Sequence, residues 1–254
     1  MVRAAGCVAC HTDIKKKGKP FAGGPPLETP FGKFYGPNIT PDKSAGIGNW
    51  TLQEFSNALT QGIAPDGSHY FPAFPFTHYT LMAQQDIADI KAYLDTVKAV
   101  SKPARDNEIM WPFSDRNLMA GWKWLFFQEG AYSSDSTKNA SWNRGAYLVT
   151  GPAHCGACHT DRNLLGGRTS PALTGTKSGP EGHPVPGIRR EQGQMVDWTK
   201  EDIIFGLQTG LKPDGDVMGG AMGEVIEEGT SHMNDSDLSA IADYLLSVSK
   251  KDEK

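Results

Sequence analysis

The sequence predicts an all-α protein built as two tandem domains of one type, with long loops and a tryptophan-rich connector. Three observations favour this fold: an internal repeat, helical spacing of apolar residues near the end of each half, and a near absence of strand-like alternation. The chain of 254 residues is long enough for two modest domains. We expect the first domain at residues 1–99, the connector at 100–140 and the second domain at 141–254.

The repeat is visible as a constant spacing of 148 positions between matching segments. This offset relates Cys7 to Cys155, Trp50 to Trp198, Gly62 to Gly210, and the Pro-Asp-Gly segment at 65–67 to that at 213–215. Chance does not maintain one offset over so long a stretch. The chain is therefore interpreted as a tandem duplication of one domain.

Each half is predicted to run helix, long loop, helix, loop, helix. A capping-box pattern at Thr51 and Glu54 predicts the start of the middle helix, and residues 199–202 repeat this pattern. The last helix of each half is expected at 86–97 and at 235–247, where apolar residues recur every three to four positions. These elements are the basis of the all-α prediction.

All four cysteines belong to two C-x-x-C-H motifs, which end in His11 and His159. This pattern marks covalent haem attachment, because two thiols at this spacing match the two vinyl groups of haem. The histidine that follows then lies under the iron and binds it through its ring. The sequence therefore predicts two haem c groups, bound through Cys7, Cys10, Cys155 and Cys158.

Other interpretations of the cysteines explain less. A thioredoxin-like redox pair needs a βαβ context, which surrounds neither motif. A zinc-binding interaction module with four thiolate ligands leaves both histidines unexplained. Two C-x-x-C disulfides leave them unexplained as well, and they would close only very short loops.

The composition gives no reason to expect nucleic acid or an anionic membrane as partner, because the net charge is −4. The longest apolar run, at 118–127, is about half of the roughly 20 residues that a membrane span needs. No phosphate-binding glycine loop, dinucleotide fingerprint or nucleophile elbow is found. The sequence therefore predicts no transmembrane segment and no catalytic residues.

The first motif lies close to the start of the chain. In the second half a helix over 142–149 precedes the motif, whereas in the first half only Met1 and Val2 correspond to its end. No signal peptide is visible. We expect that a signal peptide has been removed or that the front of the chain is truncated.

These motifs resemble the class I cytochrome c fold in duplicate. More closely, together with the segments at 36–42, 70–75 and 142–159, they resemble diheme c-type cytochromes related to the cytochrome subunits of bacterial membrane-bound alcohol and gluconate dehydrogenases. The resemblance covers essentially the whole chain. It implies a periplasmic electron carrier or subunit that takes electrons from a dehydrogenase and passes them to another cytochrome or an oxidase.

The resemblance also implies a partner for each proximal histidine. In class I cytochromes a Gly-Pro-x-Leu segment supplies a carbonyl that accepts a hydrogen bond from the second ring nitrogen. Gly24-Pro25-Pro26-Leu27 matches this pattern, and a similar segment lies at 170–173. We therefore expect the carbonyls of Pro25 and Pro171 to hold His11 and His159.

On the distal side, the resemblance implies a methionine ligand between the second and third helices. Met222 has this position in the second half, but its counterpart in the first half is Phe74, which cannot bind iron. Met82 is our expected distal ligand there, with His78 as the alternative. If neither residue binds, the first iron has an open site, and the alternative function is that of a peroxidase-like haem enzyme.

Overall fold

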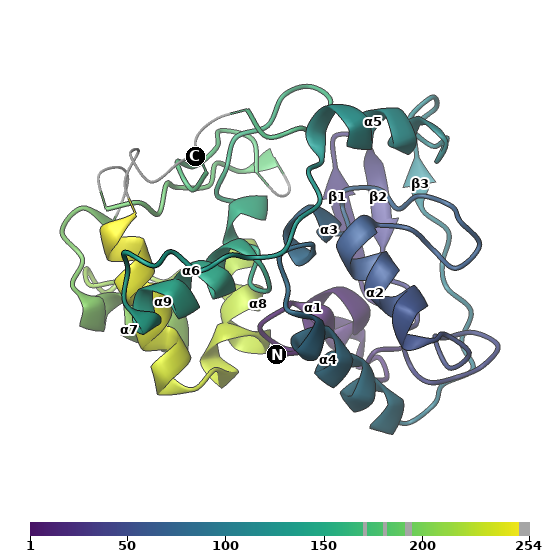
Figure 1. The fold of residues 1–254 in the computed structure, drawn as a ribbon, viewed down its shortest axis with the longest axis horizontal. Coiled ribbons are helices and arrows are strands. Elements are labelled where there is room, and N and C mark those ends of the chain that lie inside the picture. Colours follow the sequence, from purple (N-terminus) through teal and green to yellow (C-terminus); the bar gives the residue numbers. More distant parts are fainter. Residues whose placement is uncertain (170–171, 180–181, 191–194, 249–254) are drawn as a thin grey trace. The chain divides into compact units, whose positions relative to one another are not determined.

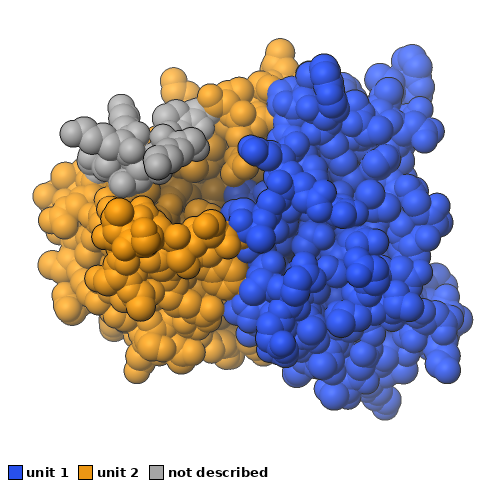
Figure 2. Space-filling model, in the orientation of Figure 1, with its two compact units in different colours: residues 1–2, 6–131 blue, residues 3–5, 132–254 orange. Residues whose placement is uncertain are grey.

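The computed structural model describes residues 1–169, 172–179, 182–190 and 195–248. The chain forms two compact units (Figure 2): unit 1 contains residues 1–2 and 6–131, and unit 2 contains residues 3–5 and 132–254. Residues 100–131, which belong to the expected connector, fold with unit 1. The domain boundaries expected from the sequence, at residues 99 and 141, remain a prediction.

The elements of each unit follow the chain order (Figure 1). In unit 1 they are α1 (Cys7–His11), a 3-10 turn (Ile14–Lys16), β1 (Pro26–Thr29), β2 (Gly32–Tyr35), α2 (Leu52–Gln61), α3 (Phe76–Tyr79), α4 (Gln84–Thr96), β3 (Glu108–Ile109) and α5 (Leu118–Phe126). In unit 2 they are α6 (Ala140–Thr150), a 3-10 turn (Cys155–Ala157), α7 (Lys200–Thr209), α8 (Gly220–Glu228), a 3-10 turn (Thr230–His232) and α9 (Asp235–Ser247). No helix among the described residues is both long and apolar enough to cross a membrane.

The all-α prediction is wrong, because unit 1 contains a three-stranded antiparallel sheet in the order β1-β2-β3. Strands β1 and β2 form a hairpin in which Pro26 pairs with Tyr35 and Thr29 with Gly32. Strand β3 adds to β2 from far along the chain, with Lys33 opposite Glu108. The strands are short, and this long-range pairing leaves no periodic signal in the local sequence.

The backbone geometry of α2 and α7 agrees with the internal repeat. Both helices begin with a complete capping box, at Thr51 with Glu54 and at Thr199 with Asp202. Both end at a glycine with positive φ, which is 63° in α2 and 78° in α7. A left-handed glycine at this position ends a helix without the steric cost that a Cβ atom would add.

The core of unit 2 is the crossing of α6 and α9. At Gly145 the two backbones approach so closely that an added Cβ would lie 1.9 Å from the Ala240 carbonyl oxygen. Leu148 and Leu238 are both fully buried. The crossing therefore depends on a residue without a side chain at one point and on aliphatic packing elsewhere.

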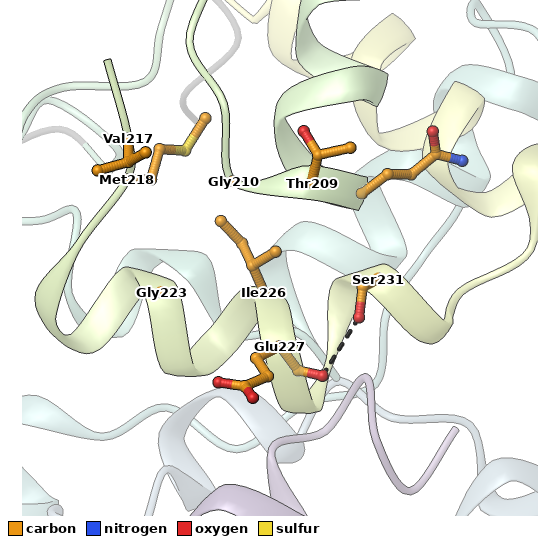
Figure 3. Close-up of a pocket in the computed structure, with 9 residues that line it drawn as sticks. Thr209, Gly210, Val217, Met218, Gly223, Ile226, Glu227 and Ser231 are labelled. Carbon is orange, nitrogen blue, oxygen red and sulfur yellow. Dashed lines mark hydrogen bonds between the residues drawn. The ribbon is translucent and has the colours of Figure 1, made fainter. Parts of the chain in front are cut away.

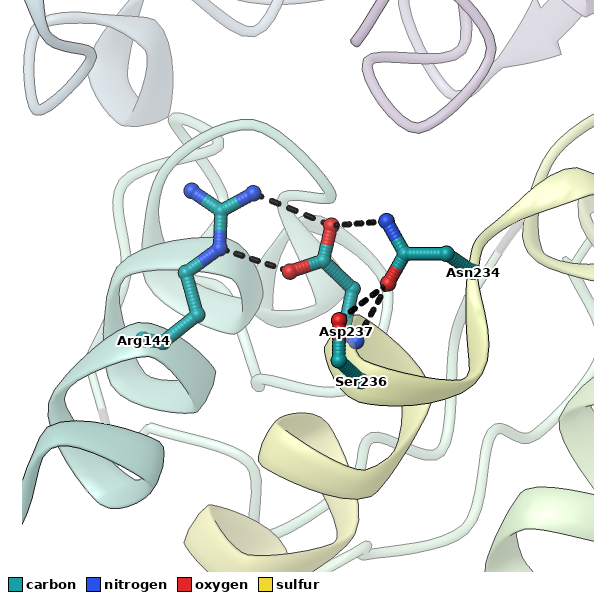
Figure 4. A network of polar contacts seen from close by, with 4 residues as sticks. All are labelled: Arg144, Asn234, Ser236 and Asp237. Carbon is teal, nitrogen blue, oxygen red and sulfur yellow. Dashed lines mark hydrogen bonds and ion pairs between the residues drawn. The ribbon is translucent and has the colours of Figure 1, made fainter.

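A polar network connects the same two helices at the surface (Figure 4). The Arg144 guanidinium contacts both carboxylate oxygens of Asp237, at 2.7 and 3.0 Å. Asn234 caps α9 by accepting a hydrogen bond from the Asp237 backbone N–H at 2.7 Å, and its amide nitrogen lies 3.3 Å from the Asp237 carboxylate. Two-point contact of this kind fixes the orientation of α6 against the start of α9.

Candidate haem site in each unit

The histidine of the first motif is held by a backbone carbonyl. Helix α1 carries the motif and ends at His11, whose Nδ1 lies 2.7 Å from the Pro37 carbonyl oxygen. A carbonyl can only accept a hydrogen bond, so Nδ1 must carry the proton. The other ring nitrogen, Nε2, is then left with a lone pair and can bind a metal.

The second motif repeats this contact. His159 Nδ1 lies 2.8 Å from the Pro186 carbonyl oxygen, and the histidine is buried. Pro37 follows His11 by 26 residues, and Pro186 follows His159 by 27. The two units therefore fix the tautomer of their histidine in the same way.

These carbonyls differ from the ones expected. The structure brings Pro37 to His11 in place of Pro25, because the β1-β2 hairpin separates the two prolines and the chain returns to the motif only after β2. Pro171 lies outside the described residues, and Pro186 makes the contact with His159. Gly36-Pro37 is itself a Gly-Pro segment. Pro37 follows His11 by nearly as many residues as Pro186 follows His159, and this similar spacing was the signal that could have revealed the contact.

The loop after each histidine also has the same construction in both units. The Thr12 hydroxyl oxygen accepts the backbone N–H of Phe21 at 3.0 Å, and the Thr160 hydroxyl oxygen accepts that of Leu173 at 3.1 Å. Phe21 and Leu173 have positive φ values of 60° and 66°. Non-glycine residues rarely adopt this conformation, so the buried threonine stabilises a strained turn in each unit.

Two glycines allow this loop to approach the first motif. An added Cβ on Gly24 would lie 2.0 Å from the Cys10 carbonyl oxygen, and one on Gly36 would lie 1.8 Å from the same atom. No side chain larger than hydrogen is compatible with these distances. The backbone on both sides of the hairpin is therefore packed directly against the motif.

The electrostatic surroundings favour neutral imidazoles. Burial lowers the pKa of His11 and of His159, and the hydrogen bond to the proline carbonyl opposes this shift in each case. A histidine must be neutral to bind a metal. Both histidines are thus kept in the form that an iron ligand needs.

Helix α3 brings Tyr79 close to the thiols of the first motif. Burial raises the pKa of the Tyr79 phenol well above its usual range, and the neighbouring Cys7 and Cys10 raise it further. The Phe74 ring packs edge-on against Tyr70 and Tyr79, with centroid distances of 5.4 and 5.7 Å. Phe74, the counterpart of Met222, is therefore part of an aromatic cluster beside the motif.

The two distal candidates of unit 1 are both buried, since Met82 and His78 are each 2% exposed. Met82 lies directly before Ala83, the N-cap residue of α4. Met233 has the same position before the N-cap of α9, and the turns that precede both helices share their hydrogen bonds. The structure thus gives Met82 a packing role at a helix start in addition to its predicted role as a ligand.

In unit 2 the candidate Met222 is half-buried in the first turn of α8. The neighbouring Met218 packs elsewhere, because an added Cβ on Gly206 of α7 would lie 2.6 Å from the Met218 methyl carbon. Met218 therefore fills space against α7, and Met222 stays the predicted distal ligand of unit 2.

Comparison with known proteins identifies the family. The model of the family described as cytochrome c matches residues 1–98. A protein from Cereibacter sphaeroides named "Diheme cytochrome c-type" is 39% identical, and the alignment covers 96% of this chain and 82% of that protein. The chain belongs to the cytochrome c family.

Two further relatives are longer than this cytochrome. The fructose dehydrogenase cytochrome subunit of Gluconobacter japonicus is 41% identical over 98% of the chain, which covers 51% of that subunit. A nicotinate dehydrogenase chain of Pseudomonas putida is 40% identical over 97% of the present chain, which covers 21% of that protein. The chain thus spans about half and about a fifth of these relatives. The family implies covalently bound haem and electron transfer.

The residues present in this cytochrome fit covalent haem better than a redox-active cysteine pair. Burial raises the pKa of the Cys7 thiol to about 12 and that of Cys155 to about 12. Reactive C-x-x-C pairs instead depend on a lowered thiol pKa. With a neutral imidazole beside the thiols in each unit, the donor set matches thioether attachment followed by iron binding.

Proposed function

We propose that the chain carries two haem c groups, one in each unit, and relays electrons in the periplasm. The donor in this proposal is a dehydrogenase, and the acceptor is another cytochrome or an oxidase. The observation that supports it most is the repeated proximal arrangement, in which His11 and His159 each donate Nδ1–H to a proline carbonyl beside a cysteine pair. A duplicated site of this kind is expected when two cofactors work in series.

The protein contributes attachment, orientation and protection from water. Four thiols, those of Cys7, Cys10, Cys155 and Cys158, form the thioethers, and the two histidines hold the iron. The proline carbonyls fix each imidazole plane and increase the basicity of the ligating nitrogen. Haem supplies one-electron chemistry, and the polarity of its surroundings sets the potential.

For the distal side we propose Met222 in unit 2, and Met82 in unit 1 with His78 as the alternative. A methionine ligand raises the potential of the haem relative to histidine. If Met82 binds, the two haems have similar ligand sets, whereas His78 would make the first haem the low-potential one. The identity of this ligand therefore decides the direction in which electrons flow most readily between the units.

The haem count tests the proposal directly. The protein is produced in a host competent in cytochrome maturation, and its intact mass is measured after denaturation. We expect the mass of the polypeptide plus two haems, and a reductive titration that consumes two electrons per chain. A mass with one haem or none would contradict the proposal.

Variants distinguish the two distal candidates of unit 1. Met82→Leu keeps the apolar packing at the start of α4 but removes the sulfur, and His78→Gln removes the imidazole. The variant that converts one of the two haems to a high-spin spectrum identifies the ligand. If both variants stay fully low-spin, the two candidates are wrong.

A further inference from the structure

A surface pocket of about 410 Å³ lies in unit 2 (Figure 3). It is formed by the end of α7, the turn that follows, one face of α8 and the start of the next turn. Its lining residues are Gln208, Thr209, Gly210, Val217, Met218, Gly223, Ile226, Glu227 and Ser231. None of the proposed haem ligands belongs to this set.

The same surface exists in unit 1 by virtue of the repeat. Gly62 and Gly210 end equivalent helices. Eight positions later, the Tyr70 N–H donates to the Gly62 carbonyl at 2.8 Å, and the Met218 N–H donates to the Gly210 carbonyl at 2.7 Å. The side chain over this glycine is Phe76 in unit 1 and Ile226 in unit 2. The two surfaces therefore share the same backbone hydrogen bond and an apolar side chain at the same place.

Before the last helix, the correspondence continues. Met82 N–H bonds to the Tyr79 carbonyl, and Met233 N–H bonds to the Thr230 carbonyl, at 2.9 and 3.0 Å. This alignment makes Thr80 of unit 1 the counterpart of Ser231 of unit 2. The edge of the pocket thus has an equivalent in unit 1 as well.

In unit 1 this surface is covered by α5 and its flanks. The Lys123 ammonium donates to the carbonyl oxygens of Gln61 and Gly62, at 2.7 and 2.8 Å, and so caps the end of α2. It also lies 2.9 Å from His69 Nδ1. The Gly130 N–H donates to the Thr80 hydroxyl oxygen at 3.1 Å.

Aromatic packing completes this cover. The rings of Trp122 and Phe127 meet the Phe76 ring edge-on, with centroid distances of 6.4 and 5.1 Å. The Arg116 guanidinium lies 5.2 Å from the Tyr70 ring centroid. One lysine-bearing helix with aromatic neighbours thereby covers the surface whose equivalent remains a pocket in unit 2.

We propose that the pocket of unit 2 is a docking site for an amphipathic helix of a partner protein. This helix carries a lysine flanked by aromatic residues, as α5 does, and its ammonium caps the end of α7 at Thr209 and Gly210. Its aromatic side chains cover Met218 and Ile226. Helices that bind in grooves are anchored in this way by a few apolar side chains.

The charge of the pocket supports a cationic occupant. The last carbonyls of α7 carry the negative end of the helix dipole, and in the described part of the chain no lysine or arginine side chain donates to those of Thr209 and Gly210. Glu227 lies at the edge of the pocket, and its exposed carboxylate is directed away from Ile226 (Figure 3). In unit 1 the corresponding helix end has its cation in Lys123. The proposal is independent of the haem count.

A peptide with the sequence of residues 114–131 of this chain is a suitable probe. The labelled peptide is titrated into the haem-loaded full chain, and its fluorescence anisotropy is recorded. We expect saturable binding that weakens about tenfold when the peptide carries Lys123→Glu, and about tenfold when the protein carries Glu227→Lys.

Glu201→Lys is the matched control, because it makes the same charge change in the first turn of α7, at the opposite end of that helix from the pocket. We expect it to leave binding within about twofold of the original. The proposal is overturned if the peptide does not saturate, or if Glu227→Lys leaves its affinity unchanged. It is also overturned if the unlabelled chain self-associates and Glu227→Lys abolishes this, since the occupant is then a second copy.

Discussion

Units 1 and 2 agree in how they hold the histidine of the cysteine motif and differ in the segments predicted to supply the distal ligand. In both, a proline carbonyl holds the histidine, and a buried threonine supports a left-handed turn. At the position of the predicted distal ligand Met222, which lies in the first turn of α8 in unit 2, unit 1 has Phe74 in an aromatic cluster. The contact that holds the histidine is thus common to both units, whereas the segments that we propose for the distal ligands differ.

The units also differ in how each is covered. In unit 2, α6 crosses α9. In unit 1, by contrast, α5 covers the end of α2, where unit 2 has an open pocket. The cover over the end of the middle helix therefore differs between the units, and variants can address the two units separately.

The largest expected effect is loss of one haem. Replacing both Cys7 and Cys10 by serine should lower the haem content from two per chain to one, because thioether bonds to that haem can no longer form. A pyridine haemochrome assay measures this content. The reciprocal change at Cys155 and Cys158 should give the same value, and a variant that retains two haems would contradict separate attachment.

The second-largest expected effect is a change in the midpoint potential of the haem of unit 2. Met222→His should keep the second iron six-coordinate but lower its midpoint potential by on the order of 0.2 V, within the roughly 0.8 V range over which axial ligands act. Spectroelectrochemical titration measures this shift. Met218→Leu is the control, because Met218 packs against α7; a comparable shift in that variant would make Met218 the ligand instead.

The crossing of α6 and α9 should be sensitive to a single methyl group. Gly145→Ala places a Cβ against the Ala240 carbonyl and should lower the free energy of unfolding of unit 2 by about 1–3 kcal/mol. The control Gly121→Ala lies in α5, where nothing stands within 4 Å of the added atom, and should stabilise that helix by about 0.5–1 kcal/mol. Denaturant unfolding of both variants tests the contrast.

The smallest effect is a pH dependence in unit 1. Burial lowers the pKa of Lys123 from 10.5 to about 8, and the nearby Arg116 contributes to this shift. Between these values the unfolded chain binds more protons at this site than the folded one, so stability should rise with pH. Lys123→Met should remove this contribution, and the difference between the two stability curves over about pH 8 to 10.5 measures it. Parallel curves would show that the shift is absent.

Much of this comparison could be predicted from the sequence, since the repeat, the capping boxes and the bounds of α9 depend on local patterns. The β1-β2-β3 sheet could not, because Lys33 pairs with Glu108 across most of unit 1. The carbonyl partner of His11 was missed for a related reason. Two Gly-Pro segments lie within reach in the sequence, and only the folded hairpin decides that Pro37 returns to the motif.

The spin state of the two irons tests the central claim, that each is held from both faces by this chain and carries electrons without binding a substrate. Visible spectra of the oxidised and reduced protein are recorded with and without carbon monoxide. We predict low-spin spectra for both haems, a methionine-to-iron charge-transfer band and no change with carbon monoxide. A high-spin fraction that binds carbon monoxide at one haem per chain would contradict the claim and favour a haem enzyme in unit 1.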